Sequence, residues 1–210
     1  MPTPHPSRWR RRKAARPDEI LAAALASFAE RGFAATRLED VAGRAGISKG
    51  TLYLYFKGKE ELFEAVVRAT LLPSIERVEA LAATFEGPSA QLLERLLLAF
   101  AGVVDSRTGA LPKLVIAEAG NFPDLARFYL NEVIRRGLRL IGAILRRGIA
   151  RGEFRAVDVD HAVFCVVAPM LLGALWKNSL EAYDDAPMDT QALARVHLDL
   201  LLRGLEAHRP

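Results

Sequence analysis

Apolar residues recur at helical spacing along almost the whole chain. The segment PDEILAAALASFAERG, residues 17–32, has acids in its first turn, apolar residues three and four positions apart, and a glycine at its end. This pattern predicts an amphipathic helix. Further helices are expected from residue 59 until Pro73 or Gly87 interrupts, and at 89–104, 111–119, 123–150, 158–183 and 190–208. Because the sequence has no alternating strand pattern and no long repeat, the predicted fold class is all-α, with about nine helices.

Two short helices are predicted between the first helix and residue 57. Thr36 stands three residues ahead of Glu39, which is the spacing of a capping box, and Gly46 ends the helix that this box would start. Ser48 is expected to cap the next helix. Because Gly46 can adopt a positive φ, so brief a connection is typical of a helix-turn-helix.

The third helix is predicted to have a buried and an exposed side. Leu52 and Phe56 are four residues apart and face inward, whereas the other side offers amine and hydroxyl groups and a glycine. Such groups suit phosphate oxygens; Lys49 could reach a guanine edge, and Thr51 or Leu54 a thymine methyl group. The alternative is an ordinary amphipathic helix with solvated lysines, and periodicity alone does not decide between the two.

Composition places the excess of positive charge at the N-terminus. The chain has 210 residues, of which 51% are hydrophobic, and a formal net charge of +4. Of its 29 basic residues, six lie in residues 1–16, where there is no acid, so the other 23 are set against all 25 acids. We expect residues 1–16 to form a disordered basic arm that contacts an anionic partner. Its cations are Arg8, Arg10, Arg11, Arg12, Lys13 and Arg16.

Several classes of protein are disfavoured by the sequence. The single Cys165 excludes an internal disulfide framework and a thiolate zinc cluster, and its apolar neighbours predict a buried thiol. The most apolar stretch, residues 162–176, is shorter than the roughly 20 residues of a membrane span and is interpreted as a buried helix. No apolar region follows the N-terminal charges, so a secretory signal is not expected and a cytoplasmic location is predicted.

Enzymatic chemistry has little support in the sequence. The histidines have no metal-ligand spacing, and no phosphate-loop, GxSxG or CxxC pattern occurs. We therefore predict no cofactor, no metal site and no enzymatic activity. An all-α enzyme with a catalytic group hidden in the apolar half remains an alternative, as does a membrane-surface protein that binds anionic lipid through its arginine arm.

The stretch GFAATRLEDVAGRAGISKGTLYLYFKGKEELF resembles the N-terminal domain of TetR-type transcriptional regulators. The match runs from about residue 16 to residue 62 and combines a turn glycine, Ser-Lys-Gly-Thr, Leu-Tyr-x-Tyr-Phe and Lys-Glu-x-Leu in order. The resemblance implies a three-helix helix-turn-helix domain at residues 17–64, with the third helix as the recognition helix. Many relatives have a polar or aromatic residue where this chain has Leu54, so methyl contact is what this position offers. The positions implied to contact DNA are Thr36, Arg37, Ser48, Lys49, Gly50, Thr51, Tyr53, Leu54, Tyr55 and Lys59.

The second half, residues 65–210, resembles the family's ligand-binding and dimerisation domain in its helical layout. The segments AEAGNFPDLARFY and RRGIARGEFRAVDVDHA are similar to one branch of the family. The family pairs its last two helices across a twofold axis, whereas the alternative is one large intrachain core. The apolar stripe expected at the dimer interface is Leu193, Val196, Leu200, Leu201 and Leu205.

Pro169 is expected to kink the helix at residues 158–183 and so to help line a ligand cavity. The candidate walls of this cavity are Phe100, Asn121, Phe122, Phe128, His161, Phe164, Met170 and Trp176.

These expectations combine into one functional prediction. The chain is predicted to be a homodimeric, ligand-responsive transcriptional regulator that binds a near-palindromic operator in double-stranded DNA. A small hydrophobic effector would release it, which makes it a repressor, and no membrane partner is expected. A transcriptional activator of the same fold is the alternative, beside the enzyme and membrane-surface hypotheses above.

Overall fold

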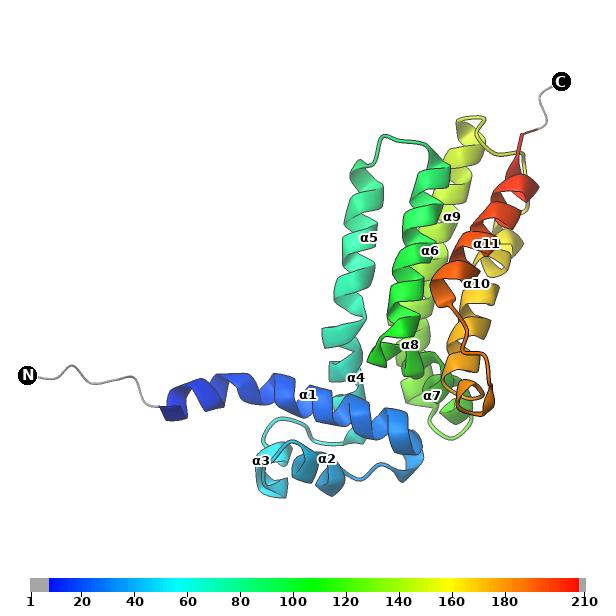
Figure 1. The fold of residues 1–210 in the computed structure, drawn as a ribbon. Coiled ribbons are helices and arrows are strands. Elements are labelled where there is room, and N and C mark those ends of the chain that lie inside the picture. Colours follow the sequence, from blue (N-terminus) through cyan, green and yellow to red (C-terminus); the bar gives the residue numbers. More distant parts are fainter. Residues whose placement is uncertain (1–7, 208–210) are drawn as a thin grey trace, which may run out of the picture. The chain divides into compact units, whose positions relative to one another are not determined.

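The computed structural model describes residues 8–207, and the side chains of residues 17–207 (Figure 1). No β-strand occurs among the described residues, which carry an isolated bridge between Phe154 and Glu206. The predicted all-α fold class is thereby confirmed. In chain order the elements are α1 (Arg8–Ala35), α2 (Leu38–Arg44), α3 (Lys49–Tyr53), α4 (Lys59–Thr70), α5 (Leu72–Thr84), α6 (Ser89–Asp105), the 3-10 turn η1 (Arg107–Ala110), α7 (Leu111–Glu118), α8 (Pro123–Tyr129), the π-helical turn η2 (Leu130–Ile134), α9 (Arg135–Ala150), α10 (Val159–Lys177), the 3-10 turn η3 (Glu181–Tyr183) and α11 (Thr190–Leu205).

The chain divides into two compact units, Met1–Ala69 and Thr70–Pro210. The boundary expected from the sequence lies at residue 64, but the division falls near the end of α4. The reason is that the apolar face of α4, with Phe63 and Val66 fully buried, packs into the first unit. The Phe63 ring lies 5.9 Å from the Phe28 ring and 5.8 Å from the Phe33 ring, between centroids. These aromatic contacts hold α4 to α1.

The basic N-terminal stretch is helical from Arg8 onward, whereas the sequence predicts a disordered arm over residues 1–16. The arginines, lysine and alanines of this stretch have high helix propensities, and they extend α1 ahead of Pro17. Residues 1–7, which complete the expected arm, lie outside the described residues. Gly32 breaks the helical backbone with φ 80°, a conformation that favours glycine.

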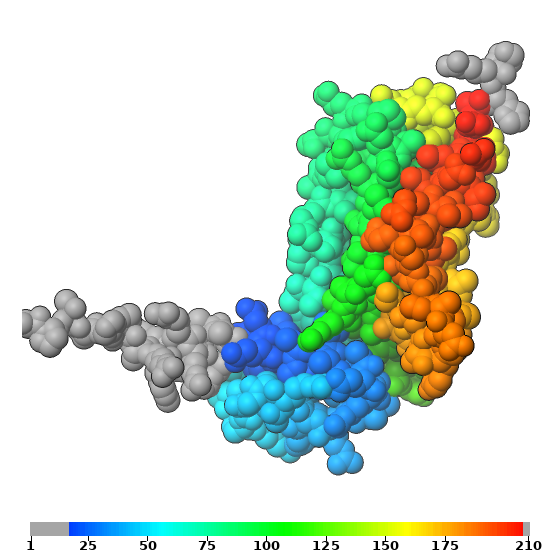
Figure 2. All heavy atoms as spheres, viewed as in Figure 1, coloured from blue at the N-terminus to red at the C-terminus, as the bar shows by residue number. Residues whose placement is uncertain are grey.

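The second unit has its core between α6, α9, α10 and α11. Leu93, Leu145, Val166 and Met170 are fully buried there. Figure 1 shows α6 and α9 running side by side, with α10 and α11 packed against them. α11, drawn in red and orange, forms part of the surface of this unit in Figure 2.

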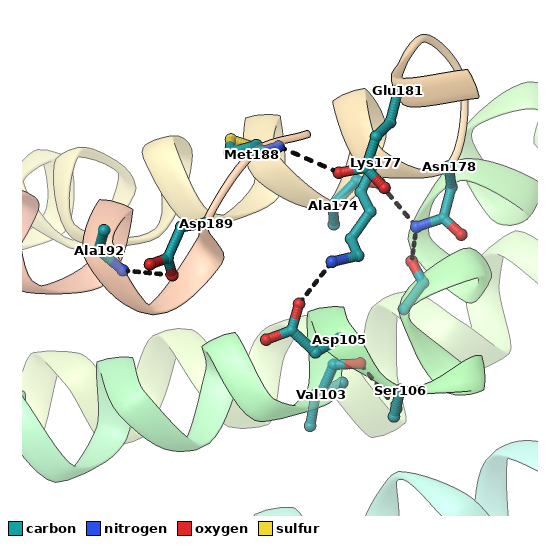
Figure 3. Close-up of polar contacts among 11 residues, drawn as sticks. Val103, Asp105, Ser106, Ala174, Lys177, Asn178, Glu181, Met188, Asp189 and Ala192 are labelled. Carbon is teal, nitrogen blue, oxygen red and sulfur yellow. Dashed lines mark hydrogen bonds and ion pairs between the residues drawn. The ribbon is translucent and has the colours of Figure 1, made fainter. Parts of the chain in front are cut away.

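Polar contacts join the ends of these helices (Figure 3). Lys177 on α10 donates to the Asp105 carboxylate on α6 over 2.7 Å, and the side-chain amide of Asn178 donates to the Ala174 carbonyl over 2.8 Å. Burial raises the pKa of Asp105, but hydrogen bonds, of which the one from Lys177 is the largest, outweigh this effect and hold the pKa below its usual range. The Asp189 carboxylate accepts from the backbone N–H of Ala192 and so caps α11. These contacts satisfy polar groups at helix ends, which would otherwise lack partners.

Candidate nucleic-acid interface

The turn between α2 and α3 is closed by backbone hydrogen bonds. Ile47 N–H donates to the Ala42 carbonyl over 3.0 Å, and Gly46 N–H donates to the Gly43 carbonyl over 3.1 Å. Gly46 has φ +66°, as predicted. Together these bonds form a Schellman motif, in which the left-handed residue lets the chain reverse directly after the helix. The turn therefore sets the direction in which α3 starts.

α3 is a short helix that is stabilised by a side-chain cap at its start and by burial of its inner side. The Ser48 hydroxyl accepts from the backbone N–H of Thr51 over 3.1 Å, which confirms Ser48 as the predicted N-cap. Leu52 is fully buried, as predicted, and Phe56 is half-buried. A helix of five residues is too short to be stable alone, so the cap and this burial hold it in place.

The opposite side of α3 and the turn that follows it present large side chains to solvent. Leu54 is 85% exposed, Tyr53 45% and Tyr55 38%. Ser48, Lys49 and Gly50 are exposed beside them, and Thr51 is half-buried. We call the exposed residues of this set, Ser48, Lys49, Gly50, Tyr53, Leu54 and Tyr55, the reading face. An exposed apolar and aromatic surface of this kind is typical of a binding surface rather than of a solvated one.

Gly50 has no structural requirement inside the chain. Its φ is not positive, and a Cβ atom built there would meet only the Ser48 hydroxyl, at an ordinary 3.9 Å. An alanine would be the better helix former at this position. Because nothing within the chain requires a glycine at this exposed position, we infer that its missing side chain lets another molecule approach the backbone closely.

Ion pairs join α2 to α1 and to α3. Lys49 pairs with Glu39 of α2, and its Nζ atom lies 5.8 Å from the centroid of the Tyr53 ring. The hydrogen bond between Lys49 and Glu39 lowers the pKa of Glu39 and raises the pKa of Lys49. Arg31 of α1 pairs with Asp40 over 2.7 Å. Such contacts brace α2 against both neighbouring helices.

Two residues that are expected to contact DNA also make contacts within the chain. Thr36 is buried, and its hydroxyl lies 2.6 Å from the Gly32 carbonyl. It does not cap α2, whose N-cap is the exposed Arg37 without a side-chain cap bond, so the predicted capping box is wrong. Lys59 donates to the Ala34 carbonyl over 3.0 Å and lies 4.6 Å from the centroid of the Phe33 ring. Thr36 therefore belongs to the core, and Lys59 ties α4 to the end of α1.

The expected cavity walls differ in how deeply they are buried in the second unit. Met170 is fully buried in the core, against which Phe100 packs, and Phe122 and Phe128 are half-buried. His161 is exposed and pairs with Asp158, Asn121 is exposed, and Phe164 is 57% exposed. His161, Asn121 and Phe164 therefore lie at the surface, and Trp176 is partly exposed. α10 is apolar on all sides, so its sequence could not show which side faces inward.

α10 and α11 carry large exposed apolar side chains on the second unit. Phe164 and Leu172 are exposed on α10, and Val196 and Leu200 on α11. Of the expected dimer stripe, Leu193 and Leu201 are half-buried, whereas Leu205 is 4% exposed and belongs to the intrachain core. The predicted interface is therefore corrected by removing Leu205 from it. We call Phe164, Leu172, Val196 and Leu200 the apolar face.

α10 is less buried than predicted. Cys165 is exposed, which corrects the expectation of a buried thiol. By length and composition, α10 is the one helix in the described part of the chain that is long and apolar enough to cross a membrane. It packs against α6, α9 and α11, as the core helix of a globular domain does.

Comparison with known proteins assigns this arrangement to a class. Residues 20–66 match the model of bacterial regulatory proteins of the tetR family, and residues 86–190 match the tetracyclin repressor-like C-terminal domain. The chain belongs to the TetR family and is a DNA-binding transcriptional regulator. Regulators of this family bind DNA operators and small-molecule effectors and are dimeric.

Individual relatives match over nearly their whole length. The transcriptional repressor KstR2 of Mycolicibacterium smegmatis is 29% identical over 194 residues, which cover 91% of each chain. The fatty acid metabolism regulator of Bacillus subtilis is 28% identical over 192 residues, covering 89% of this chain and 94% of that protein. The solved structure of the ketosteroid regulator KstR2 of Mycobacterium tuberculosis is 27% identical, with a TM-score of 0.73, and covers 91% of this chain and 95% of that one.

Proposed function

We propose that the chain is a homodimeric repressor that binds a near-palindromic operator and is released by a small hydrophobic effector. The observation that carries this proposal is the reading face of α3, where Gly50 has no internal role and Leu54 is 85% exposed. Amine and hydroxyl groups on that face suit phosphate oxygens and guanine acceptors, and the leucine suits a thymine methyl group. A DNA-binding regulator acts where the DNA is, so we place it in the bacterial cytoplasm.

Dimerisation supplies two reading faces. We propose that the apolar face of α10 and α11 pairs with its counterpart in a second copy, because four large exposed apolar residues on neighbouring helices favour burial. Two copies related by a twofold axis would place one α3 in each of two successive major grooves. Half-sites about 34 to 36 Å apart, or multiples of that distance, would fit such a dimer. The basic N-terminal stretch would add contacts to phosphates.

The effector is proposed to bind in the second unit, near α8 and η2. π-helical turns are often found at functional sites, and this one follows Tyr129, whose buried phenol has a raised pKa because of desolvation. Phe122 and Phe128, both half-buried, lie on the same short segment. Two relatives are named for ketosteroid and fatty acid regulation, which supports a hydrophobic effector. Ligand binding would act by favouring one separation of the two reading faces over another.

The test starts from a pool of random-sequence duplexes. The unaltered chain is expected to select a near-palindromic duplex, and Lys49→Ala is expected to weaken binding to it far more than binding to a scrambled duplex. Hydrophobic acids and steroids are then screened for release, measured by fluorescence anisotropy. Phe128→Ala should raise the effector concentration needed for release without changing operator affinity. Selection of no sequence by the unaltered chain would refute the proposed function.

The direction of regulation is tested separately. A reporter placed behind the selected duplex is expected to fall in output when the chain is expressed and to recover when the effector is added. A rise on expression would identify an activator of the same fold.

A further inference from the structure

Glu39 lies beside the reading face although it belongs to α2. Its Oε1 atom pairs with Nζ of Lys49, and the two side chains remain 49% and 58% exposed. The reading face is therefore bordered by a carboxylate as well as by an ammonium group. A carboxylate at a DNA-binding surface is repelled by phosphates, so its presence there needs a reason.

Like Glu39, the neighbouring acids pair with a basic residue of another helix. Asp40 pairs with Arg31, and Glu30 pairs with Arg44 over 2.5 Å, and both pairs join α2 to α1. Glu39 differs because its partner is a residue that is itself proposed to contact bases. Lys49 cannot approach the major groove without bringing the Glu39 carboxylate close to it, unless the pair breaks.

The chemistry of a G·C pair matches such a pair of charges. In the major groove guanine presents two acceptors, N7 and O6, and cytosine presents a donor, the N4 amino group. An ammonium group donates to the first, and a carboxylate accepts from the second. A carboxylate has about four acceptor positions, so it can bind Lys49 and a base amino group together.

We propose that Glu39 is a specificity-determining residue that accepts a hydrogen bond from a cytosine N4 amino group, in the base pair read by Lys49 or in the next one. This inference rests on the proposed function, because it requires Lys49 to lie in the major groove. Where the base at that position is guanine or thymine, the carboxylate faces only acceptors and phosphates, and binding is penalised, whereas adenine still offers its N6 amino group. Glu39 thus favours cytosine by attraction and disfavours guanine and thymine by repulsion.

The experiment measures affinities for the selected operator and for every single-base-pair variant of it. The unaltered full-length chain is compared with Glu39→Ala, Lys49→Ala and Asp40→Ala. We expect Glu39→Ala to reduce the preference for cytosine about five-fold or more at one base pair per half-site, since a hydrogen bond to a charged group is lost. That base pair should be the one affected by Lys49→Ala or its neighbour. Affinity for duplexes with guanine or thymine at that position should rise, because the repulsion is relieved.

Asp40→Ala is the matched control. It removes the same charge from the same turn of α2 and frees Arg31 instead of Lys49. We expect it to change affinity evenly across the variants. Circular dichroism monitors folding, and where Glu39→Ala is unstable, Glu39→Gln keeps the side-chain size, removes the charge and should shift the preference in the same direction by a smaller factor.

Two results would overturn the inference. The first is that Glu39→Ala and Glu39→Gln leave the base preference at every position unchanged. The second is that both raise the affinity equally for all operator variants, which would mean that Glu39 weakens DNA binding without regard to sequence. In both cases operator selection by the unaltered chain would persist, so the proposed function would stand while the role of Glu39 would not.

Discussion

Arg136 and Glu79 form a two-point contact between α9 and α5. Nε of Arg136 donates to Oε1 of Glu79 over 3.1 Å, and a terminal nitrogen donates to Oε2 over 2.6 Å. The Arg136 side chain is only 19% exposed. A bidentate pair of this kind is more directional and stronger than a single ion pair at the surface. It holds α5 against the helix that follows the π-helical turn.

This contact predicts a pH dependence of stability. The hydrogen bond from Arg136 lowers the pKa of Glu79 below its usual 4.5 in the folded chain. Its stabilising effect is therefore fully present above pH 4.5 and is lost as the pH falls through the lowered value. Glu79→Gln is expected to reduce the free energy of unfolding by about 1 kcal/mol at pH 7. Urea unfolding at several pH values should show this difference shrinking below pH 4.5, and a difference independent of pH would contradict the assignment.

A substitution at Gly50 is expected to change operator affinity and the stability of the fold in opposite directions. A Cβ atom at this position meets nothing closer than 3.9 Å in the chain. Gly50→Ala is expected to leave the fold intact and to stabilise α3 by up to about 1 kcal/mol. In the complex the added methyl group would have to fit against DNA, and overpacking of this kind costs about 1 to 3 kcal/mol of binding free energy. Thermal unfolding and operator affinity measure the two effects.

The control for this variant is Gly43→Ala. Gly43 is exposed on α2, and a Cβ atom there meets nothing within 4 Å. It should gain stability like Gly50→Ala but keep operator affinity. Equal affinities for both variants would show that the backbone at Gly50 does not approach DNA closely.

Leu200 tests the proposed dimer. It is 64% exposed on α11, whereas Leu205 on the same helix is 4% exposed. Leu200→Glu would place a charge inside the interface, so light scattering should detect monomers, and operator binding should weaken with them. Leu54→Glu changes an exposed leucine on the first unit and should remain dimeric. A dimeric Leu200→Glu variant would locate the interface elsewhere.

The helix-turn-helix could be predicted from the sequence because its signals are local. A Ser48 hydroxyl at the start of a helix has a donor within reach three residues later, and a glycine is the residue that adopts the φ of Gly46 at low cost. Leu52 lies at the helical spacing that puts it on the inner side. Each of these features depends on residues a few positions apart and not on contacts between distant parts of the chain.

Thr36 shows where local signals fail. Its spacing from Glu39 is that of a capping box, but its hydroxyl lies in hydrogen-bond distance of the Gly32 and Ser27 carbonyls of α1. Glu39 is paired with Lys49, which lies on the next helix. Both partnerships depend on how α1, α2 and α3 pack, which spacing along the chain does not record.

The inner and outer sides of the second unit were likewise decided by tertiary packing. α10 is apolar on every side, so periodicity carries no information about which residues face α6 and α9. Packing buries Val166 and Met170 and leaves Phe164 and Leu172 exposed. On α11 the apolar stripe is real, but packing against α6 takes Leu205 into the intrachain core and leaves Leu200 at the surface. The sequence alone determined that these helices exist and are apolar; only the tertiary structure decided which of their residues remain exposed, because burial depends on neighbouring helices far away in the chain.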